Sequence, residues 1–310
     1  MGKSLLTLVL VLFAAVGAWA DEVNYLDENG VLKQVEATAL TGSIDYTTIT
    51  TGWYYVTGNV NYEASFLVQG DVHLILVDGC YLESHGGPYA VAGIEVELGN
   101  SLSIYAQSTG EDAGTLFADG GYNCAGIGAT RNWGRPNNGN ITINGGFITA
   151  LGNVTVGAPG IGGEGSATVT INGGVVNATA QVSNTRSSGI RSGNVIITGG
   201  VVTATGISPS LGIAGNCQVT GGNVISNGNT TFTSDGSTPV YPLEIITGKA
   251  GVSVEIASEG YEAETDAAGN ATIWLPSSTY DIDFSRGSKA IEEESFDKNT
   301  SAQILDITGL

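Results

Sequence analysis

Residues 140 to 150 read Asn140-Ile-Thr-Ile-Asn-Gly-Gly-Phe-Ile-Thr-Ala150, and three related segments follow, beginning at Thr168, Asn194 and Cys217. Each segment has a short run of apolar and polar residues, then a Gly-Gly pair, then a second short run. The second glycines stand at 146, 174, 200 and 222, so successive repeats are 28, 26 and 22 residues long. A recurring period of this length indicates stacked structural repeats.

The short runs of Ile or Val with Thr or Asn fit strands that are buried on one side and wet on the other. The Gly-Gly pair supplies the backbone freedom for a sharp bend between two strands. A Gly-Ile pair that recurs at 93/94, 126/127, 160/161, 189/190 and 212/213 marks a third bend. Three bends per repeat describe one coil of a right-handed parallel β-helix. Leucine-rich repeats, the main alternative at this period, require a leucine frame that this sequence lacks.

The predicted fold class is therefore all-β: a right-handed single-stranded parallel β-helix followed by a small antiparallel β-sandwich. The β-helix is expected over residues 61–233, after an N-terminal cap at 21–60 that is more charged and aromatic. The segment Ser234-Asp-Gly-Ser-Thr-Pro239 has the composition of a linker, placed at 234–240. Over 241–310, short alternating runs at roughly 8 to 10 residue intervals are typical of a sandwich.

The N-terminus predicts export. Lys3 gives a cationic start, Leu5 to Val16 is apolar, and Ala18-Trp19-Ala20 is a small-x-small cleavage site, so residues 1–20 are expected to be a signal peptide. No Cys follows the cleavage site for lipid attachment, and no other apolar run approaches the roughly 18 residues of a membrane-spanning helix. We expect a secreted or cell-surface protein without membrane insertion.

The charge excludes one class of partner. The chain has 30 Asp and Glu against 10 Lys and Arg, a formal net charge of −20, which repels nucleic acid. Its three cysteines, Cys80, Cys124 and Cys217, are widely spaced without a C-x-x-C motif, and we expect them to be small buried apolar residues rather than a disulfide framework or metal ligands. No metal or cofactor is therefore expected, and calcium at the acidic N-terminal coils stays open as an alternative.

Two stretches of the chain resemble known families. The segments Tyr25-Leu-Asp-Glu-Asn-Gly30 and Gly52-Trp-Tyr-Tyr-Val-Thr-Gly58, together with the Ile-Thr-Ile-Asn-Gly-Gly coils, are similar to secreted parallel β-helix proteins of gut Bacteroidales-type bacteria, described as carbohydrate-binding-domain or adhesin-like proteins. The C-terminal Thr265-Asp-Ala-Ala-Gly269, Leu275-Pro276 and Tyr280 resemble carboxypeptidase-regulatory-like, prealbumin-like modules, which act as spacers or docking units. The resemblance implies a polysaccharide or glycoprotein glycan as partner, or other cell-surface proteins, and carries over no catalytic motif.

Acidic residues are too sparse in the central coils for polysaccharide cleavage there. Residues 121–240 hold only Glu164 and Asp235, whereas a hydrolase needs two carboxyl groups and a lyase needs several for calcium. The enzymatic alternative is a polysaccharide lyase or glycoside hydrolase that uses acids of the N-terminal coils. Its candidates are Asp71 and His73 on one strand face, and Glu95 and Glu97 on a face of another coil. The competing interpretation is that these four residues are solvated edges of acidic coils.

A long loop, Thr130-Arg-Asn-Trp-Gly-Arg-Pro-Asn-Asn-Gly139, interrupts the repeats. Insertions in repeat proteins often lie on the binding face. An aromatic ring there can stack on a sugar, and Arg or Asn side chains can bond hydroxyls or carboxylates; alternatively, the loop folds down over the coil edge. The candidate ligand-binding residues are Trp133, Arg131, Arg135, Asn132, Asn137 and Tyr122. We therefore expect a non-enzymatic glycan-binding or adhesin-like protein, with the enzyme and a structural surface spacer as alternatives.

Overall fold

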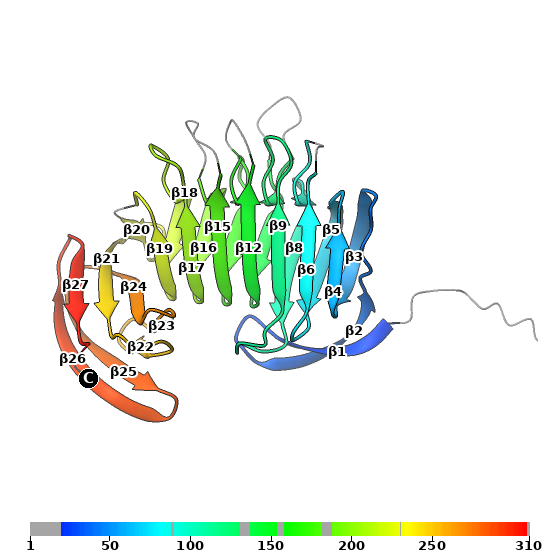
Figure 1. Cartoon of the computed structure of the whole chain (residues 1–310). Helices are drawn as coiled ribbons and strands as arrows, with labels where there is room; N and C mark the ends of the chain where they lie inside the picture. Colours follow the sequence, from blue (N-terminus) through cyan, green and yellow to red (C-terminus); the bar gives the residue numbers. More distant parts are fainter. Residues whose placement is uncertain are drawn as a thin grey trace, which may run out of the picture.

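The computed structural model describes residues 20–87, 90–130, 137–153, 158–181, 188–229 and 231–308, and every regular element in these ranges is a β-strand. The strands form three sheets, of 16, 7 and 4 members. Figure 1 shows most of them side by side in a stack, with the N-terminal strands at one end and the C-terminal strands at the other. The predicted signal peptide lies outside the described ranges, apart from Ala20. Within those ranges no helix is long and apolar enough to span a membrane.

The first part of the chain forms a hairpin and the first turns of the stack. The hairpin strands β1 and β2 are antiparallel, and the strands after them pair in parallel with a strand about one repeat further along the chain. These elements are β1 (Ala20–Leu26), β2 (Leu32–Ala39), β3 (Thr47–Val56), β4 (Asn59–Tyr62), β5 (Phe66–Leu76), β6 (Tyr81–His85), β7 (Ile94–Val96), β8 (Ser101–Ala106) and β9 (Thr115–Asp119).

The repeat segments found in the sequence continue the stack in register. Ile141 pairs with Val169, which pairs with Val195, and beyond the Gly-Gly bend Ile148 pairs with Val176 and then Val202. These elements are β10 (Ile127–Gly128), β11 (Asn140–Ile143), β12 (Phe147–Gly152), β13 (Ile161–Gly162), β14 (Thr168–Ile171), β15 (Val175–Ala180), β16 (Ile190–Ile197), β17 (Val201–Thr205), β18 (Ile213–Val219) and β19 (Asn223–Ser226).

Each repeat contributes to three ladders, which give the stack three faces. The first face contains β7, β10 and β13 with the opening residues of β5, β16 and β18. The second face contains β8, β11 and β14 with the closing residues of the same long strands. The third face is the seven-stranded sheet, in the order β19-β17-β15-β12-β9-β6-β4.

Alternating side chains explain why the repeats stack. In β11 and β14 every second residue is apolar and fully buried, so each added repeat extends one continuous core. The Gly-Gly bends allow the close stacking of neighbouring repeats. Gly174 has a φ of +82°, and a Cβ atom there would lie 2.6 Å from the carbonyl oxygen of Gly146 in the repeat before. Only glycine fits that backbone without strain.

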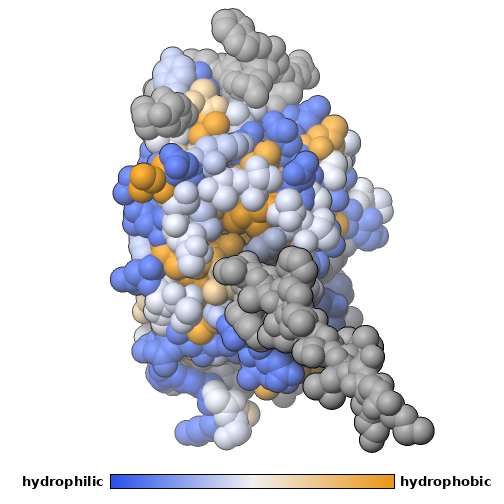
Figure 2. All heavy atoms as spheres, turned by 90° about the vertical axis from the view of Figure 1, so that its right-hand side faces the viewer, coloured by the Kyte–Doolittle hydropathy of each residue, from blue (hydrophilic) through white to orange (hydrophobic). Residues whose placement is uncertain are grey.

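The N-terminal hairpin packs against the outside of the second face. Tyr25 lies with ring centroids 4.8 Å from Trp53 and 5.0 Å from Tyr105, and Val23 is buried in the same cluster. The open edge of β4 is also occupied, because the Ser43 N–H donates to the Asn61 carbonyl. Figure 2 looks at this end of the molecule, where hydrophobic side chains lie between hydrophilic ones. The hairpin over the second face and the segment at Ser43 on the edge of β4 cover this end of the stack, which prevents uncontrolled strand addition.

The predicted architecture, a right-handed parallel β-helix followed by a separate antiparallel β-sandwich, is wrong for this chain. The 16-stranded sheet does not stop where the repeats stop: it passes through β20, which is antiparallel to β21, and on to β24 and β27. β21 and β27 are moreover parallel, and only the four-stranded sheet is wholly antiparallel. The remaining elements are β20 (Phe232–Thr233), β21 (Pro239–Ile246), β22 (Ser253–Ile256), β23 (Tyr261–Glu264), β24 (Asn270–Leu275), β25 (Ser278–Arg286), β26 (Lys289–Lys298) and β27 (Gln303–Asp306).

The physical reason for this correction is the segment expected as a linker. Its residues form the tight turn between β20 and β21. The Asp235 carboxylate accepts hydrogen bonds from the backbone N–H groups of Ser237 and Thr238, at 2.8 and 2.6 Å, and these bonds hold the Asp235 pKa well below its ordinary value. Gly236 takes the left-handed conformation, with φ +85°. Ser, Asp, Gly and Pro are typical of linkers and of hairpin turns alike.

Candidate functional site

The first face carries a row of outward side chains that is interrupted by glycine. Pairing places Glu95 beside Gly128, Gly128 beside Gly162, and Gly162 beside Arg191. Two neighbouring strands therefore present bare backbone between a carboxylate and a guanidinium. Side chains are excluded at Gly162 by the backbone itself, because a Cβ atom there would lie 2.0 Å from the Arg191 carbonyl oxygen.

A polar hollow of about 260 Å³ opens at the Arg191 end of this row. We call it the first-face groove. Its lining residues are Gly163, Glu164, Gly165, Arg191, Ser192, Ala214 and Gly215. Arg191 Nη2 lies 3.0 Å from Glu164 Oε1, and the two side chains are only 20% and 17% exposed. The groove therefore offers a paired donor and acceptor beside a floor of small residues.

The loop proposed for ligand binding returns to the sheet beside this groove. Arg131, Asn132, Trp133 and Arg135 lie outside the described residues. Asn137 forms a parallel bridge with Glu164, and its side-chain oxygen lies against Gly165, where a Cβ atom would approach it to 2.6 Å. The structure thus places Asn137 at the rim of the groove.

Tyr122, the other described candidate from the loop region, lies in the turn between β9 and β10. Its side chain is 56% exposed, and its carbonyl oxygen accepts a hydrogen bond from Cys124 Sγ at 3.4 Å. It does not line the first-face groove. Its predicted role as a ligand contact stays a prediction.

A buried amide lies directly behind the groove. Asn138 Nδ2 donates to the Ser192 hydroxyl at 3.2 Å, and that hydroxyl donates to the Ala167 carbonyl at 2.6 Å. Asn138 Oδ1 is fully buried and has no hydrogen-bond partner within the described protein. A buried acceptor of this kind is costly unless a water molecule satisfies it. The Asn138 and Ser192 contacts hold the groove wall to the loop end.

The structure does not bring the four N-terminal candidates for catalysis into one cluster. β5 bends at Gly70, so Asp71 and His73 lie on the second face, opposite Ser101 and Ser103, while Glu95 lies on the first face. His73 Nε2 is 3.3 Å from Asp71 Oδ2, and its ring stacks on Trp53 with centroids 4.2 Å apart. This pair therefore belongs to the aromatic cluster that holds the N-terminal hairpin.

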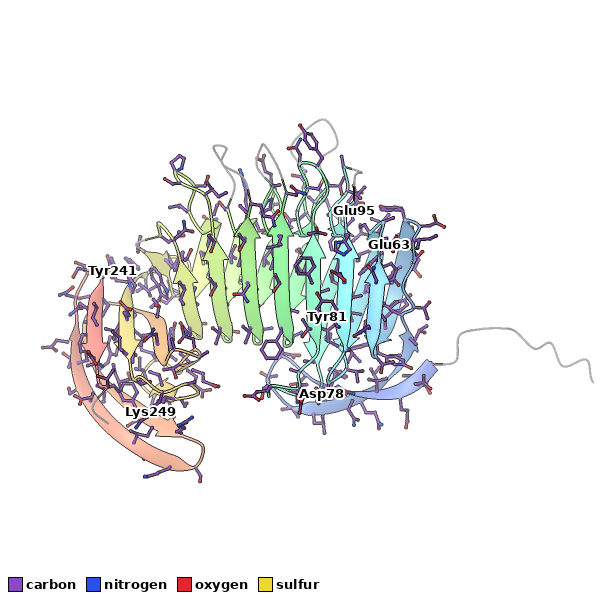
Figure 3. All side chains as sticks on the ribbon, in the orientation of Figure 1. Glu63, Asp78, Tyr81, Glu95, Tyr241 and Lys249 are labelled. Carbon is purple, nitrogen blue, oxygen red and sulfur yellow. The ribbon has the colours of Figure 1, made fainter. Side chains whose placement is uncertain are left out.

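Glu95 and Glu97 do lie together. Glu95, labelled in Figure 3, is at the other end of the first-face row. Glu95 is only 4% exposed and accepts a hydrogen bond of 2.6 Å from the Tyr46 hydroxyl. Glu97 is an exposed residue, but partial desolvation of its carboxyl group raises its pKa, and the charge of Glu95 and a hydrogen bond to it raise that pKa further. Glu97 forms an antiparallel bridge with Asn138, and Glu164 forms a parallel bridge with Asn137, so residues 137–138 run between the chain segments that carry Glu97 and Glu164.

On the third face a histidine lies between two carboxylates, an arrangement that the sequence did not predict. His85 Nδ1 lies 2.6 Å from Asp119 Oδ1, and His85 Nε2 lies 3.1 Å from Glu83 Oε1. The carboxylates occupy opposite edges of the ring, so they do not converge on a common point. In the part of the chain that the structure describes, no group of three or more His, Cys, Asp or Glu side chains is arranged to hold a metal ion.

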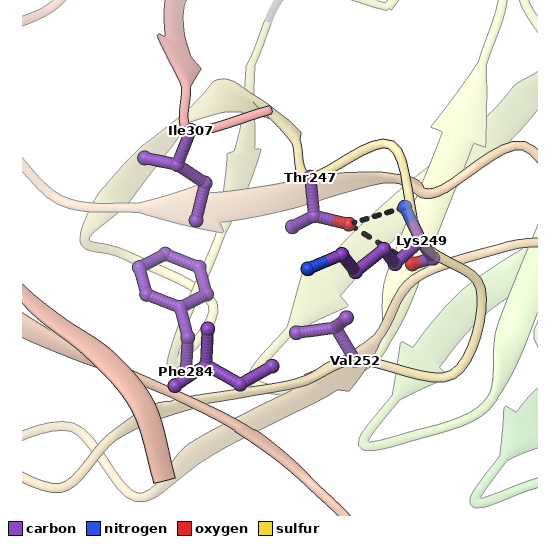
Figure 4. A pocket seen from close by; sticks show the side chains of 6 residues that line it. Thr247, Lys249, Val252, Phe284 and Ile307 are labelled. Carbon is purple, nitrogen blue, oxygen red and sulfur yellow. Dashed lines mark hydrogen bonds between the residues drawn. The ribbon is translucent and has the colours of Figure 1, made fainter. Parts of the chain in front are cut away.

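The cysteines and a second cavity add no chemistry. Cys80, Cys124 and Cys217 are buried and form no disulfide with one another, and burial raises the thiol pKa of Cys80 to about 11 and of Cys217 to about 12. A cavity of about 10 Å³ lies between Thr247, Lys249 and Phe284 in the C-terminal part (Figure 4). That volume suits at most one water molecule.

Comparison with known proteins assigns no family. No protein-family model matches the chain, and no curated protein and no solved structure shows significant similarity to it. The function therefore has to be argued from the chain's own residues.

Proposed function

We propose that the protein is a non-enzymatic, adhesin-like glycan-binding protein that receives its ligand at the first-face groove. The observation that carries the proposal is the Glu164–Arg191 pair beside a floor of glycine and small residues. A sugar hydroxyl can donate to a carboxylate and accept from a guanidinium at the same time. The two charges cancel, so the groove suits a ligand with many hydroxyl groups better than a strongly charged one.

The neighbourhood of the groove supports the same conclusion. Asn137 adds an amide at the rim, and the six residues before it in the sequence include Arg131, Asn132, Trp133 and Arg135. Aromatic and amide side chains are common partners of sugars because one stacks and the other bonds hydroxyls. The loop residues keep their proposed role as ligand contacts, and Tyr122 is a more distant candidate.

The enzymatic alternative has weaker support. Among the described residues that line the groove, Glu164 is the one carboxylate, and His73, which lies beside Asp71, stacks on Trp53 in the hairpin cluster. The spacer alternative explains the long stack but gives no reason for a charged pair in a hollow.

We also propose that the protein is exported and acts in the medium or at the cell surface. The support is the predicted signal peptide and the resemblance to secreted carbohydrate-binding-domain proteins.

A glycan array with residues 21–310 tests the proposal. The wild-type protein is compared with Glu164→Gln, Arg191→Met and Trp133→Ala, and with Arg286→Met, which removes an exposed arginine on β25 far along the chain. We expect the affinity for the bound glycan to fall about tenfold or more in Glu164→Gln and Arg191→Met, because each lost charged hydrogen bond contributes roughly 1.5–3 kcal/mol. The affinity should also fall in Trp133→Ala and stay unchanged in Arg286→Met. Circular dichroism checks that each variant is folded.

Two results would contradict the proposal. The first is a wild-type protein that binds no glycan. The second is binding that survives both Glu164→Gln and Arg191→Met. Repeating the array in EDTA separates the calcium alternative, since direct recognition by side chains persists without metal.

A further inference from the structure

The outer side of the third face is a broad strand surface that nothing else in the described chain crosses (Figure 1). Inward residues of its strands, such as Leu116, Ile148 and Val176, are fully buried in the stack core. The outward residues between them are half-buried or exposed. Because each strand pairs in register with the next, these outward residues form straight rows across the sheet.

Three aromatic rings lie near one end of this surface. Tyr81 and Phe147 stand on either side of Thr115 in one row, and Phe117 lies on the strand between them, in the next row. Tyr81 is 38% exposed and points outward (Figure 3). Strands are about 4.8 Å apart, so the Tyr81 and Phe147 positions are separated by roughly 10 Å. The rings therefore form a platform rather than a buried cluster.

The platform continues into rows of neutral side chains. Every outward residue of β12, β15 and β17 is uncharged, although the whole chain has a net charge of −20. One row is apolar and the neighbouring row carries hydroxyl and amide groups. The two rows are Phe147, Val175 and Val201, and Thr149, Asn177 and Thr203.

The charge of the molecule decides between occupants of this surface. A second copy, a nucleic acid or an anionic membrane would each bring negative charge towards an acidic protein. A neutral polysaccharide meets no such repulsion. The faces of its sugar rings are apolar and suit the aromatic and valine row, while its hydroxyl groups can bond the threonine and asparagine row.

We propose that the outer side of the third face is a second binding surface, which holds an extended neutral polysaccharide along the stack. The inference shares its ligand class with the proposed function, but it uses different residues on a different face. The first-face groove contacts a few sugar units, whereas the third face contacts a length of chain. The two sites can therefore be tested separately.

The test is retention of residues 21–310 on insoluble cellulose and chitin, and retardation in native gels that contain a soluble neutral β-glucan, with polygalacturonate as the anionic contrast. The double variant Phe117→Thr, Phe147→Thr removes two rings while keeping strand-compatible residues. Tyr81→Thr is a milder variant at a more exposed position. The matched control is Ile304→Thr, since Ile304 is 61% exposed on β27. Arg191→Met marks the first-face groove.

We expect retention on at least one neutral polysaccharide, reduced about tenfold in the double variant, reduced less in Tyr81→Thr, and unchanged in Ile304→Thr. Retention that survives the double variant but is lost in Arg191→Met would overturn the third-face site and leave the proposed function intact. Glycan-array binding without retention on any neutral polysaccharide would do the same. Retention on polygalacturonate alone would overturn the argument from charge. If circular dichroism shows that the double variant does not fold, the test rests on Tyr81→Thr, and unchanged retention of that folded variant overturns the inference.

Discussion

Replacing Asn223 should loosen the junction between the repeat stack and the C-terminal strands. Asn223 is fully buried at the start of β19. Its amide Nδ2 donates to the carbonyl oxygens of Glu264 and Asn270 at 3.2 and 3.0 Å, and its Oδ1 accepts from the Thr272 N–H at 2.8 Å. Asn223→Ala removes all three hydrogen bonds and leaves three backbone groups without these partners.

The expected magnitude follows from that count. At about 1 kcal/mol for each net hydrogen bond, Asn223→Ala should lower the free energy of unfolding by roughly 3 kcal/mol. For a chain of this size the melting temperature should fall by roughly 6 °C. The control is Asn216→Ala, because Asn216 is exposed on the neighbouring β18. A surface change of that kind should cost less than about 0.5 kcal/mol.

The stability of the two parts is measured separately in two single-tryptophan forms of residues 21–310. One keeps Trp53 in the stack, the other keeps Trp274 in β24, and phenylalanine replaces the other tryptophans. Urea unfolding is followed by fluorescence in each form, with and without Asn223→Ala. Since one sheet connects both parts, both midpoints should fall together. A shift confined to Trp274 would mean that the C-terminal strands unfold as a separate domain, and a shift no larger than that of Asn216→Ala would refute the junction argument.

Three further predictions concern the stack itself. Gly174→Ala should destabilise the protein by roughly 1–3 kcal/mol, because alanine is strained at φ +82° and its Cβ meets the Gly146 carbonyl; Gly110→Ala, with open space around it, is the control in thermal melts. Glu97 has a raised pKa in the folded state, so protonation of its carboxyl group favours the folded state. The wild type should therefore gain stability relative to Glu97→Gln as the pH falls from 7 through that raised pKa to the ordinary value of 4.5. The same difference in urea midpoint between the two proteins at pH 7 and at pH 4.5 would contradict this. A thiol reagent at pH 8 should label no cysteine in the native protein and all three in urea, since burial protects the thiols and raises the Cys80 pKa to about 11; rapid native labelling would count against this packing.

The strand content and the internal register could be predicted from the repeats. Once the Gly-Gly pairs are aligned, Ile141, Val169 and Val195 fall at equivalent positions, and the structure pairs them in that order. Periodicity reports this well because each repeat buries the same side chains against its neighbours. The prediction failed at the C-terminal part, where pairing depends on single contacts. Asn223 reaches residues 41 to 49 positions away, and no period marks such partners.

The candidate site could be predicted only in part. The loop at 130–139, which contains Asn137, was marked by its length, and Glu164 stood out as the one acid of the regular coils. Their meeting with Arg191 was not predictable, because it follows from Gly162 pairing with Arg191 and from a bridge between Asn137 and Glu164. The third face was missed because its outward residues are ordinary for strands when taken one at a time. Only their alignment into rows makes a surface.

The distribution of charge along the stack links its stability to its proposed use. Residues 21–120 hold 15 acids and residues 241–310 hold 13, while the 120 residues between them hold two. Strand edges are exposed to pairing at the two ends of a stack, and like charges concentrated there oppose end-to-end association. At physiological salt this repulsion is screened within about 8 Å. β15 lies two strand spacings from β9, roughly 10 Å, so Asp119 on β9 and the more distant Glu83 on β6 have little effect on a ligand at β15. An extended anionic polymer that reached from the middle of the third face to the acidic ends would meet this repulsion, whereas a neutral polymer would not.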